Sequence, residues 1–191
     1  MAEFNYRFFI ALIPNPEIQQ YANHIKQHFA EVYNSSGAQQ SPPHITLQPP
    51  FRWQEDNLPL LQQNLKEFAQ TKVPIPIKFS NFGAFPPKVI FINVLKTPEL
   101  LQIKQDLQIH LKRSLGIVHK EPRNRQFNPH LTVAFRDLSK QNFSLAWQKY
   151  QHQELNFNCI ISQLTLLIHK GGKWEINQEF PLLNNNQSIS N

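Results

Sequence analysis

The sequence predicts an α+β fold that consists of two related halves. A five-residue motif occurs twice, as P-H-I-T-L at residues 43–47 and as P-H-L-T-V at residues 129–133. Each half also shows the same predicted order of elements: a strand, a helix, a loop, a motif strand, a second helix and a further strand. His44 and His130 lie 86 residues apart, which is close to half of the 191-residue chain. The repeat therefore indicates an internal duplication in which the two motif strands face each other.

The first half begins with an apolar and aromatic segment, residues 6–13, which predicts a buried strand that ends at Pro14. A helix follows, because Asn15 can cap it and Pro16 suits its first turn. A polar loop then leads to the first motif strand, residues 44 to about 48. The predicted buried face of the helix carries apolar residues at helical spacing: Ile18, Tyr21, Ala22, Ile25, Phe29 and Val32.

The rest of the first half predicts a second helix over residues 58–70, with Leu61, Leu65 and Phe68 facing inward. Apolar and polar side chains alternate over residues 74–82, which predicts a strand, and the prolines there favour the edge of a sheet. Residues 83–88 contain glycine and two prolines, so we expect a turn there, at the midpoint of the chain.

The second half opens with an apolar strand at residues 89–95. Thr97 and Pro98 then start a helix that stops at Gly116, with Leu100, Ile103, Leu107 and Leu111 on its buried face. A basic loop leads to the second motif strand, residues 130 to about 135. Ser139 can cap a fourth helix, whose shared face carries Phe143, Ala146, Trp147 and Tyr150. Two closing strands are expected, one ending near His169 and one over residues 174–180, joined at Gly171 and Gly172.

These elements predict one domain over residues 1–183, with lobes of about 1–86 and 87–183 that can exchange strands. The polar segment 184–191 predicts a disordered tail. The lone cysteine, Cys159, cannot form an internal disulfide and is expected in the core, so the predicted location is the reducing cytoplasm. No segment approaches the roughly 20 apolar residues of a membrane-spanning helix.

The motifs themselves predict a phosphate site. Side chains on a strand alternate between faces, so His44 projects with Thr46, and His130 with Thr132. Two imidazoles and two hydroxyls around one point can hold a phosphate and move protons on either side of it, because imidazole has an unperturbed pKa of about 6.5. The formal charge of +6, from 19 basic and 13 acidic residues, favours phosphate-rich partners without identifying one. The scheme needs no metal and no cofactor.

Because of these two motifs, the chain resembles the 2H phosphoesterase superfamily, in particular the 2′-5′ RNA ligase-like or RNA 2′,3′-cyclic phosphodiesterase group. The resemblance implies two α+β lobes whose antiparallel sheets line a central cleft, with helices outside. It implies that His44 and His130 are catalytic, His44 as the acid and His130 as the base, and that Thr46 and Thr132 bind phosphate oxygens. The implied activity is hydrolysis of a 2′,3′-cyclic phosphate on RNA or a nucleotide, with reverse ligation to 2′-5′ linkages as a further activity.

Other side chains have both a functional and a structural interpretation. Arg123 and Arg125 could grip substrate phosphates or form a solvated loop. Lys170 and Lys173 could face the cleft or only water. His24 and His28 have a zinc-compatible spacing but lack a third ligand, which favours a surface role. Four aromatic residues near the motifs could stack on a base or belong to the core: Phe51, Trp53, Phe85 and Phe127.

Three further hypotheses stay open at this level. The substrate could be an ADP-ribose cyclic phosphate, or the chain could be a module that binds a nucleotide or RNA end without turnover. The motifs could also be structural strands whose histidines lie far apart. Catalysis predicts that the imidazoles lie roughly 5 to 8 Å apart, across one phosphate. The sequence indicates no protein partner.

Overall fold

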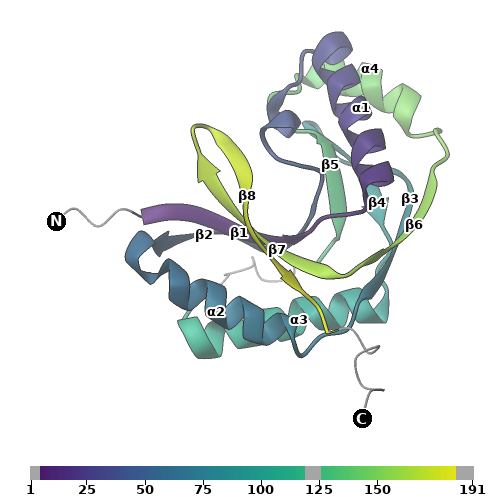
Figure 1. Ribbon diagram of the computed structural model, residues 1–191. Helices are drawn as coiled ribbons and strands as arrows, with labels where there is room; N and C mark the ends of the chain where they lie inside the picture. Colours follow the sequence, from purple (N-terminus) through teal and green to yellow (C-terminus); the bar gives the residue numbers. More distant parts are fainter. Residues whose placement is uncertain (1–4, 119–125, 184–191) are drawn as a thin grey trace.

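The computed structural model describes residues 5–118 and 126–183 and contains two four-stranded antiparallel sheets (Figure 1). In sheet A the strands lie in the order β2 (Ile45–Gln54), β1 (Asn5–Leu12), β7 (Gln163–Lys170) and β8 (Lys173–Pro181). In sheet B the order is β5 (His130–Ala134), β4 (Val89–Val94), β3 (Ile75–Phe85) and β6 (Asn156–Ile161). The two motif strands, β2 and β5, are thus edge strands of different sheets.

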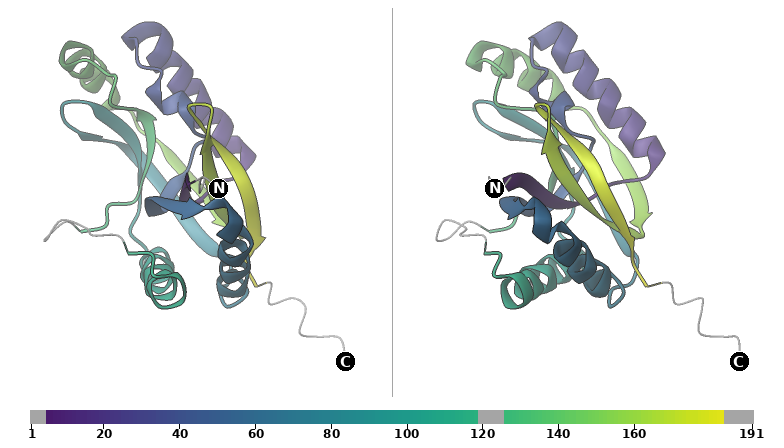
Figure 2. Two further views of the ribbon diagram at one scale, coloured as in Figure 1. Left: turned by 90° about the vertical axis from the view of Figure 1, so that its left-hand side faces the viewer. Right: turned by 60° about the vertical axis from the view of Figure 1, so that its left-hand side comes forward.

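Four α-helices cover the outer faces of the sheets (Figures 1 and 2). Helix α2 (Leu58–Ala69) packs against sheet A, and α1 (Pro16–Tyr33) and α4 (Lys140–Tyr150) pack against sheet B. Helix α3 (Pro98–Leu115) contacts both sheets, through β2 and β3. Two short 3₁₀ helices, η1 (Gly37–Gln40) and η2 (Glu55–Asn57), lie on either side of β2. The predicted α+β class, with antiparallel sheets inside and helices outside, is confirmed.

Elements from both halves of the sequence are mixed in each layer. Sheet A contains β7 and β8 from the second half, and sheet B contains β3 from the first. The chain crosses between the sheets at Ser162, the single residue that separates β6 from β7. Two closing strands were predicted, one ending near His169 and one over residues 174–180, whereas the structure has three, β6, β7 and β8.

The predicted helix ends are confirmed by their capping contacts. The side chain of Asn15 accepts a hydrogen bond from the backbone N–H of Ile18 at 3.2 Å, and Thr97 and Ser139 cap α3 and α4 in the same way. Gly116 ends α3 in the left-handed region, at a φ of 67°. These side chains satisfy N–H groups that have no partner inside the helix.

The predicted buried face of α1 is wrong at its last turn. Val32 is 56% exposed, and Tyr33 is buried in its place. The ring of Tyr33 packs 5.2 Å from that of Phe29, one helical turn earlier. The buried face therefore follows Phe29 to the position four residues later.

Two strand predictions at proline-containing segments are wrong: the end of β2 and the edge position of β3. Strand β2 does not stop near residue 48 but runs to Gln54, because an edge strand tolerates Pro49 and Pro50. Strand β3 is interior, although its prolines favoured an edge. Since β4 pairs with β3 only from Phe79 onward, the segment that carries Pro76 has β6 as its only neighbour and needs hydrogen bonds on one side.

The midpoint turn is shorter than predicted and consists of residues 86–88. Gly83 lies inside β3, where an added Cβ would overlap the ring of Phe91 and approach the Asn93 side chain within 2.5 Å. Glycine is therefore required there by close packing and not by a turn.

One main core cluster runs through both layers, and a second, small cluster consists of Phe9, Ala11 and Leu167, with Trp174 against it. This small cluster lies on the opposite face of sheet A from the main core, because its β1 members alternate with Phe8 and Ile10. In the part of the chain that the structure describes, no helix is long and apolar enough to cross a membrane.

Candidate active site

The two motif histidines line one cavity of about 460 Å³. The first motif contributes His44, the residue directly before β2, and Thr46 on β2, and the second contributes His130 and Thr132 on β5. The loop before β2, strand β1, the segment after β5 and strand β8 complete the wall. Those segments contribute Phe9, Gly37, Ala38, Gln40, Ser41, Phe135, Arg136 and Trp174, and β2 itself adds Pro50.

Strand alternation turns the motif side chains into the cavity. Ile45 and Leu47 are fully buried on the other face of β2, as are Leu131 and Val133 on the other face of β5. Burying four aliphatic side chains fixes the register of both strands, because a slip of one residue would expose all of them. The histidines and threonines between them are half-buried and face the cavity together.

Both histidines make the same local hydrogen bond. The Nδ1 atom of His44 lies 2.7 Å from the carbonyl oxygen of Pro42, and Nδ1 of His130 lies 2.7 Å from that of Asn128. A carbonyl oxygen only accepts, so Nδ1 carries the hydrogen in each ring. In the neutral form the ring lone pair is then on Nε2, which is the nitrogen that can exchange a proton with a substrate.

Phenylalanine rings hold both imidazoles in place. The ring of Phe9 lies 4.7 Å from His44, and those of Phe85 and Phe91 lie 5.1 and 5.0 Å from His130. These rings restrict the rotation of the imidazoles and exclude water from one side of each. Phe85, one of the four aromatic candidates from the sequence, thus supports a histidine.

The charge state of His44 depends on its surroundings. Burial lowers the pKa of His44 to about 4, and the positive charges of Lys26 and His130 act in the same direction, while the hydrogen bond to Pro42 opposes them. Lys26 is only 2% exposed, its own pKa is lowered by burial to about 8, and its Nζ donates to the carbonyl oxygen of Ser41 at 2.8 Å. A neutral imidazole suits a base, so this environment opposes the acid role that the resemblance implied for His44.

Asp137 connects the two walls of the cavity, the one that carries His44 and Thr46 and the one that carries His130 and Thr132. Its carboxylate accepts hydrogen bonds from the Ser35 hydroxyl at 2.8 Å and from the backbone N–H groups of Ser36 and Gly37, each at 2.7 Å. An added Cβ at Gly37 would lie 2.8 Å from the Asp137 carboxylate, so glycine allows this close approach. The segment after β5 is thereby attached to the loop that leads to His44.

The other predicted substrate contacts do not gather in the cavity. Phe51 packs 6.3 Å from Phe8 against the core, and Phe127 lies under the ammonium of Lys104 at 4.8 Å. Neither lines the cavity, and neither does Trp53. Arg123 and Arg125, like the predicted tail 184–191, lie outside the described residues.

The lining side chains that were not predicted from the sequence include Phe135, Arg136 and Trp174. Arg136 follows Thr132 by four residues, and its guanidinium lies 5.0 Å from the ring of Phe135. Proximity to the second motif was an available signal for these two. Trp174 had no such signal, because only the pairing of β7 with β1 brings strand β8 to the site.

The remaining sequence candidates have structural surroundings. His28 packs against the rings of Tyr33 and Tyr150, while His24 is exposed. Cys159 is half-buried on β6, and burial raises the pKa of its thiol. Among residues 5–118 and 126–183, no group of three or more His, Cys, Asp or Glu side chains is arranged to hold a metal ion.

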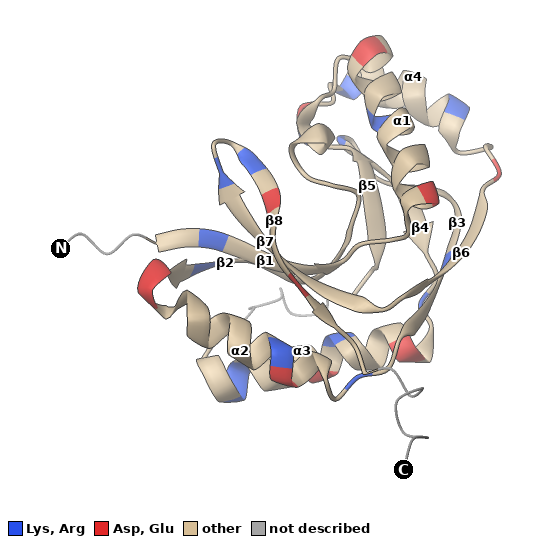
Figure 3. Cartoon of the chain, viewed as in Figure 1, with Lys and Arg blue, Asp and Glu red and all other residues tan. Residues whose placement is uncertain are grey.

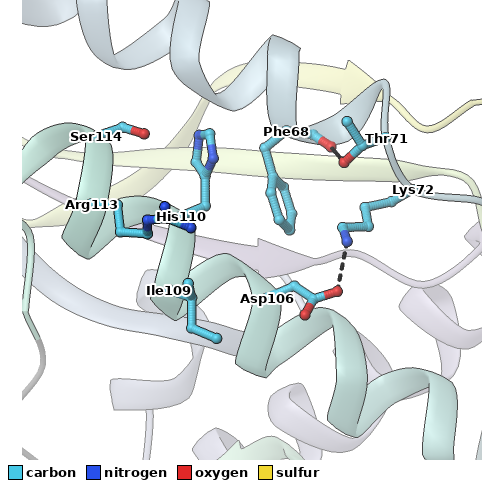
Figure 4. A pocket seen from close by; sticks show the side chains of 8 residues that line it. All are labelled: Phe68, Thr71, Lys72, Asp106, Ile109, His110, Arg113 and Ser114. Carbon is cyan, nitrogen blue, oxygen red and sulfur yellow. Dashed lines mark hydrogen bonds and ion pairs between the residues drawn. The ribbon is translucent and has the colours of Figure 1, made fainter.

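A second hollow, of about 450 Å³, lies between α2 and α3 (Figure 4). Its most polar contact is the ion pair between Lys72 and Asp106 at 2.6 Å, in which Lys72 lowers the pKa of Asp106. His110 and Arg113 also line it. It contains one histidine, which is bonded to the Asn64 carbonyl oxygen, and so lacks the paired imidazoles of the cavity between the motifs.

Comparisons with known proteins identify the family and agree with the fold. A model of the 2′-5′ RNA ligase superfamily matches residues 14–173. A Bacillus licheniformis protein named "Putative phosphoesterase" is 27% identical over 179 residues, which are 92% of this chain and 98% of that protein. A Geobacillus thermodenitrificans protein of the same name is 28% identical over 177 residues, 91% of this chain and 95% of its own.

Solved structures share the fold. E. coli LigT complexed with 3′-AMP has a TM-score of 0.69 at 18% identity, over 95% of this chain and 100% of the LigT chain. TT0787 of Thermus thermophilus has a TM-score of 0.68 at 17% identity, over 94% and 99% of the two chains. Because the family model spans most of the sequence and the architecture agrees, the chain belongs to the 2′-5′ RNA ligase superfamily of 2H phosphoesterases.

Proposed function

We propose that the protein is a phosphodiesterase that opens 2′,3′-cyclic phosphates at RNA ends or on nucleotides. One observation carries the proposal: two imidazoles line one cavity, and each has Nδ1 fixed on the carbonyl oxygen two residues earlier. Opening a cyclic ester requires one proton to leave water and another to reach the departing oxygen. Two Nε2 atoms on opposite walls can divide these transfers.

In the proposed reaction His44 is the base and His130 the acid. A water oxygen attacks phosphorus and loses its proton to Nε2 of neutral His44, whose lowered pKa keeps it uncharged at pH 7. The bond from phosphorus to one ribose oxygen breaks, and that oxygen takes the proton of His130. The product is a phosphomonoester on the other ribose oxygen. Each cycle ends with the two protonation states reversed, and exchange with solvent restores them.

The remaining polar groups of the cavity suit the charge of the phosphate. Thr46 and Thr132 can donate hydrogen bonds to the non-bridging oxygens, which carry more negative charge in the transition state. Arg136 supplies a permanent positive charge at the same cavity. If the 5′-hydroxyl of a second RNA end attacked phosphorus in place of water and the 3′ oxygen left, the two ends would be joined through a 2′-5′ linkage. Hydrolysis dominates in water because nothing in the proposed chemistry couples joining to ATP.

Relatives of the same fold support a nucleotide substrate. E. coli LigT has been solved in complex with 3′-AMP and with phosphate. Those ligands carry the phosphate and ribose that the proposed site would bind. The curated relatives named "Putative phosphoesterase" are consistent with a phosphate ester as substrate and do not specify a cyclic one.

The test is hydrolysis of adenosine 2′,3′-cyclic phosphate in EDTA by the wild type, His44→Ala and His130→Ala, with the 2′ and 3′ products resolved. We expect turnover in EDTA by the wild type and none by either variant. Folded wild type without turnover on this substrate, on short RNA ends or on ADP-ribose cyclic phosphate would overturn the proposal. Tight binding without turnover would then favour the binding module.

A further inference from the structure

Two arginines lie opposite each other on sheet A, next to the cavity. Arg7 of β1 and Arg52 of β2 are paired in register, and both are exposed. Arg7 is two residues from Phe9, which lines the cavity, so both project from the same face of β1. Two residues along a strand span about 7 Å, which places this arginine pair just beyond the wall formed by Phe9.

This arrangement costs stability, and no described carboxylate forms an ion pair with either arginine. Like charges directly opposite each other on neighbouring strands are destabilising. Within residues 5–118 and 126–183, the one ion pair joins Lys72 to Asp106, so neither arginine is paired with a carboxylate. Arg7 instead contacts the ring nitrogens of His169 at 2.9 and 3.1 Å. A pair of guanidinium groups without a carboxylate is suited to binding an anion from outside.

Trp174 connects the arginine pair to the cavity. The Cζ atom of Arg7 lies 5.7 Å from the Trp174 ring, and the ring of His169 lies 4.9 Å from it. Trp174 itself lines the cavity beside Phe9, at a ring separation of 4.7 Å. Figure 3 shows basic positions of β1, β2 and the β7–β8 hairpin at this end of sheet A, with one acidic position on the hairpin beside them. The face is thus continuous from the histidines to the arginines.

We propose that Arg7 and Arg52 bind a second phosphate of the substrate, the one on the 5′ oxygen of the ribose that carries the cyclic phosphate. The proposal rests on the proposed function. With the cyclic phosphate between the histidines, the nucleoside lies against Trp174 and Phe9, and its 5′ end points to the arginines. Guanidinium groups bind phosphate oxygens in pairs, and an aromatic face accepts a base without selecting its identity.

Three kinds of molecule carry such a phosphate: a nucleotide with a terminal 5′-phosphate, an RNA end with a phosphodiester, and an ADP-ribose cyclic phosphate with a pyrophosphate. The experiment compares adenosine 2′,3′-cyclic phosphate, which has no 5′-phosphate, with its 5′-phosphorylated form. The dinucleotide ApA 2′,3′-cyclic phosphate and ADP-ribose 1″,2″-cyclic phosphate complete the series. The enzymes are the wild type, Arg7→Gln and Arg52→Gln, with Arg113→Gln as the control for loss of one exposed arginine on α3.

We expect each of Arg7→Gln and Arg52→Gln to lower kcat/KM about 10-fold or more on substrates with a 5′-phosphate group, mainly through KM, because a charge-assisted hydrogen bond to phosphate is lost. Adenosine 2′,3′-cyclic phosphate should be hydrolysed at the wild-type rate by both variants. Arg113→Gln should leave kcat/KM unchanged on all four substrates. The 5′-phosphorylated compound whose kcat/KM falls most in the arginine variants identifies the source of the second phosphate.

Two outcomes would overturn the inference while leaving the proposed function intact. In the first, Arg7→Gln and Arg52→Gln lower kcat/KM equally on adenosine 2′,3′-cyclic phosphate and on its 5′-phosphorylated form. In the second, Arg113→Gln lowers kcat/KM by as much as they do. Failure of the wild type on all four substrates would instead refute the proposed function. The two failures are therefore distinguishable.

Discussion

The two motif strands present the same side chains in different surroundings. His44 and His130 share the backbone contact of Nδ1, the neighbouring threonine and the support of phenylalanine rings. The two imidazoles differ in their further surroundings. The buried ammonium of Lys26 acts on His44, whereas two phenylalanine rings pack against His130. Local sequence thus makes the two histidines alike, and tertiary packing makes them unequal. An acid and a base can in this way be obtained from one repeated motif.

The largest expected effect tests what the two walls share. We expect His44→Ala and His130→Ala each to lower kcat by about 10³-fold, and the double variant to lose little more, because the two proton transfers belong to one step. Steady-state hydrolysis of the cyclic phosphate measures this. His24→Ala, an exposed histidine on α1, is the matched control. A variant of either motif histidine that keeps a tenth of the activity would break the equivalence of the walls.

The hydroxyls offer the next test of the equivalence. Thr46→Val and Thr132→Val keep the branched shape of the side chain and remove one donor to the phosphate. We expect each to lower kcat about 10- to 100-fold, with a smaller change in KM, since such bonds strengthen as charge develops. Thr71→Val, on the rim of the hollow between α2 and α3, serves as the control. If kcat falls in only one of Thr46→Val and Thr132→Val, the phosphate is bound by the hydroxyl of one wall alone.

A smaller effect is expected where the walls are joined. Asp137→Ala removes three hydrogen bonds to the loop before His44 and should lower kcat about 10-fold, because that loop carries Pro42, the partner of the His44 ring. Asp56→Ala on η2 removes an exposed carboxylate elsewhere. Kinetics should be accompanied by thermal unfolding. Unchanged kcat in Asp137→Ala would show that the walls hold their positions independently.

The smallest expected effect tests what separates the walls. The charge of Lys26 lowers the pKa of His44, so its removal raises that pKa. A base loses activity once it is protonated, and the acidic limb of kcat/KM, near pH 4 in the wild type, should therefore move to higher pH in Lys26→Met. Lys149→Met on α4 should leave the limb in place. A limb that moves to lower pH would contradict the assignment of His44 as the base.

Much of the fold and the centre of the site were predictable because they depend on local patterns. Helix ends followed from Asn15, Thr97 and Ser139, and the faces of the motif strands followed from alternation. The interior position of β3 and the separate strand β6 were not predictable, since they depend on which sheet each strand joins. Trp174, which lines the cavity, and Lys26, whose charge acts on His44, were missed for the same reason, because only tertiary packing brings them to the site. The domain boundaries, the cytoplasmic location and the roles of the site residues stay predictions.

The exchange of strands between the halves has a consequence for synthesis of the protein. A nascent chain that stops before Gln163 already contains both histidines and all of sheet B, but β1 has no partner on one edge. Until β7 emerges, that edge offers unpaired backbone groups to other chains. Trp174 and the β8 side of the cavity arrive later still. The β7–β8 hairpin, which is synthesised after all of sheet B, therefore both covers the open edge of β1 and completes the cavity, so that activity begins only when this edge is paired.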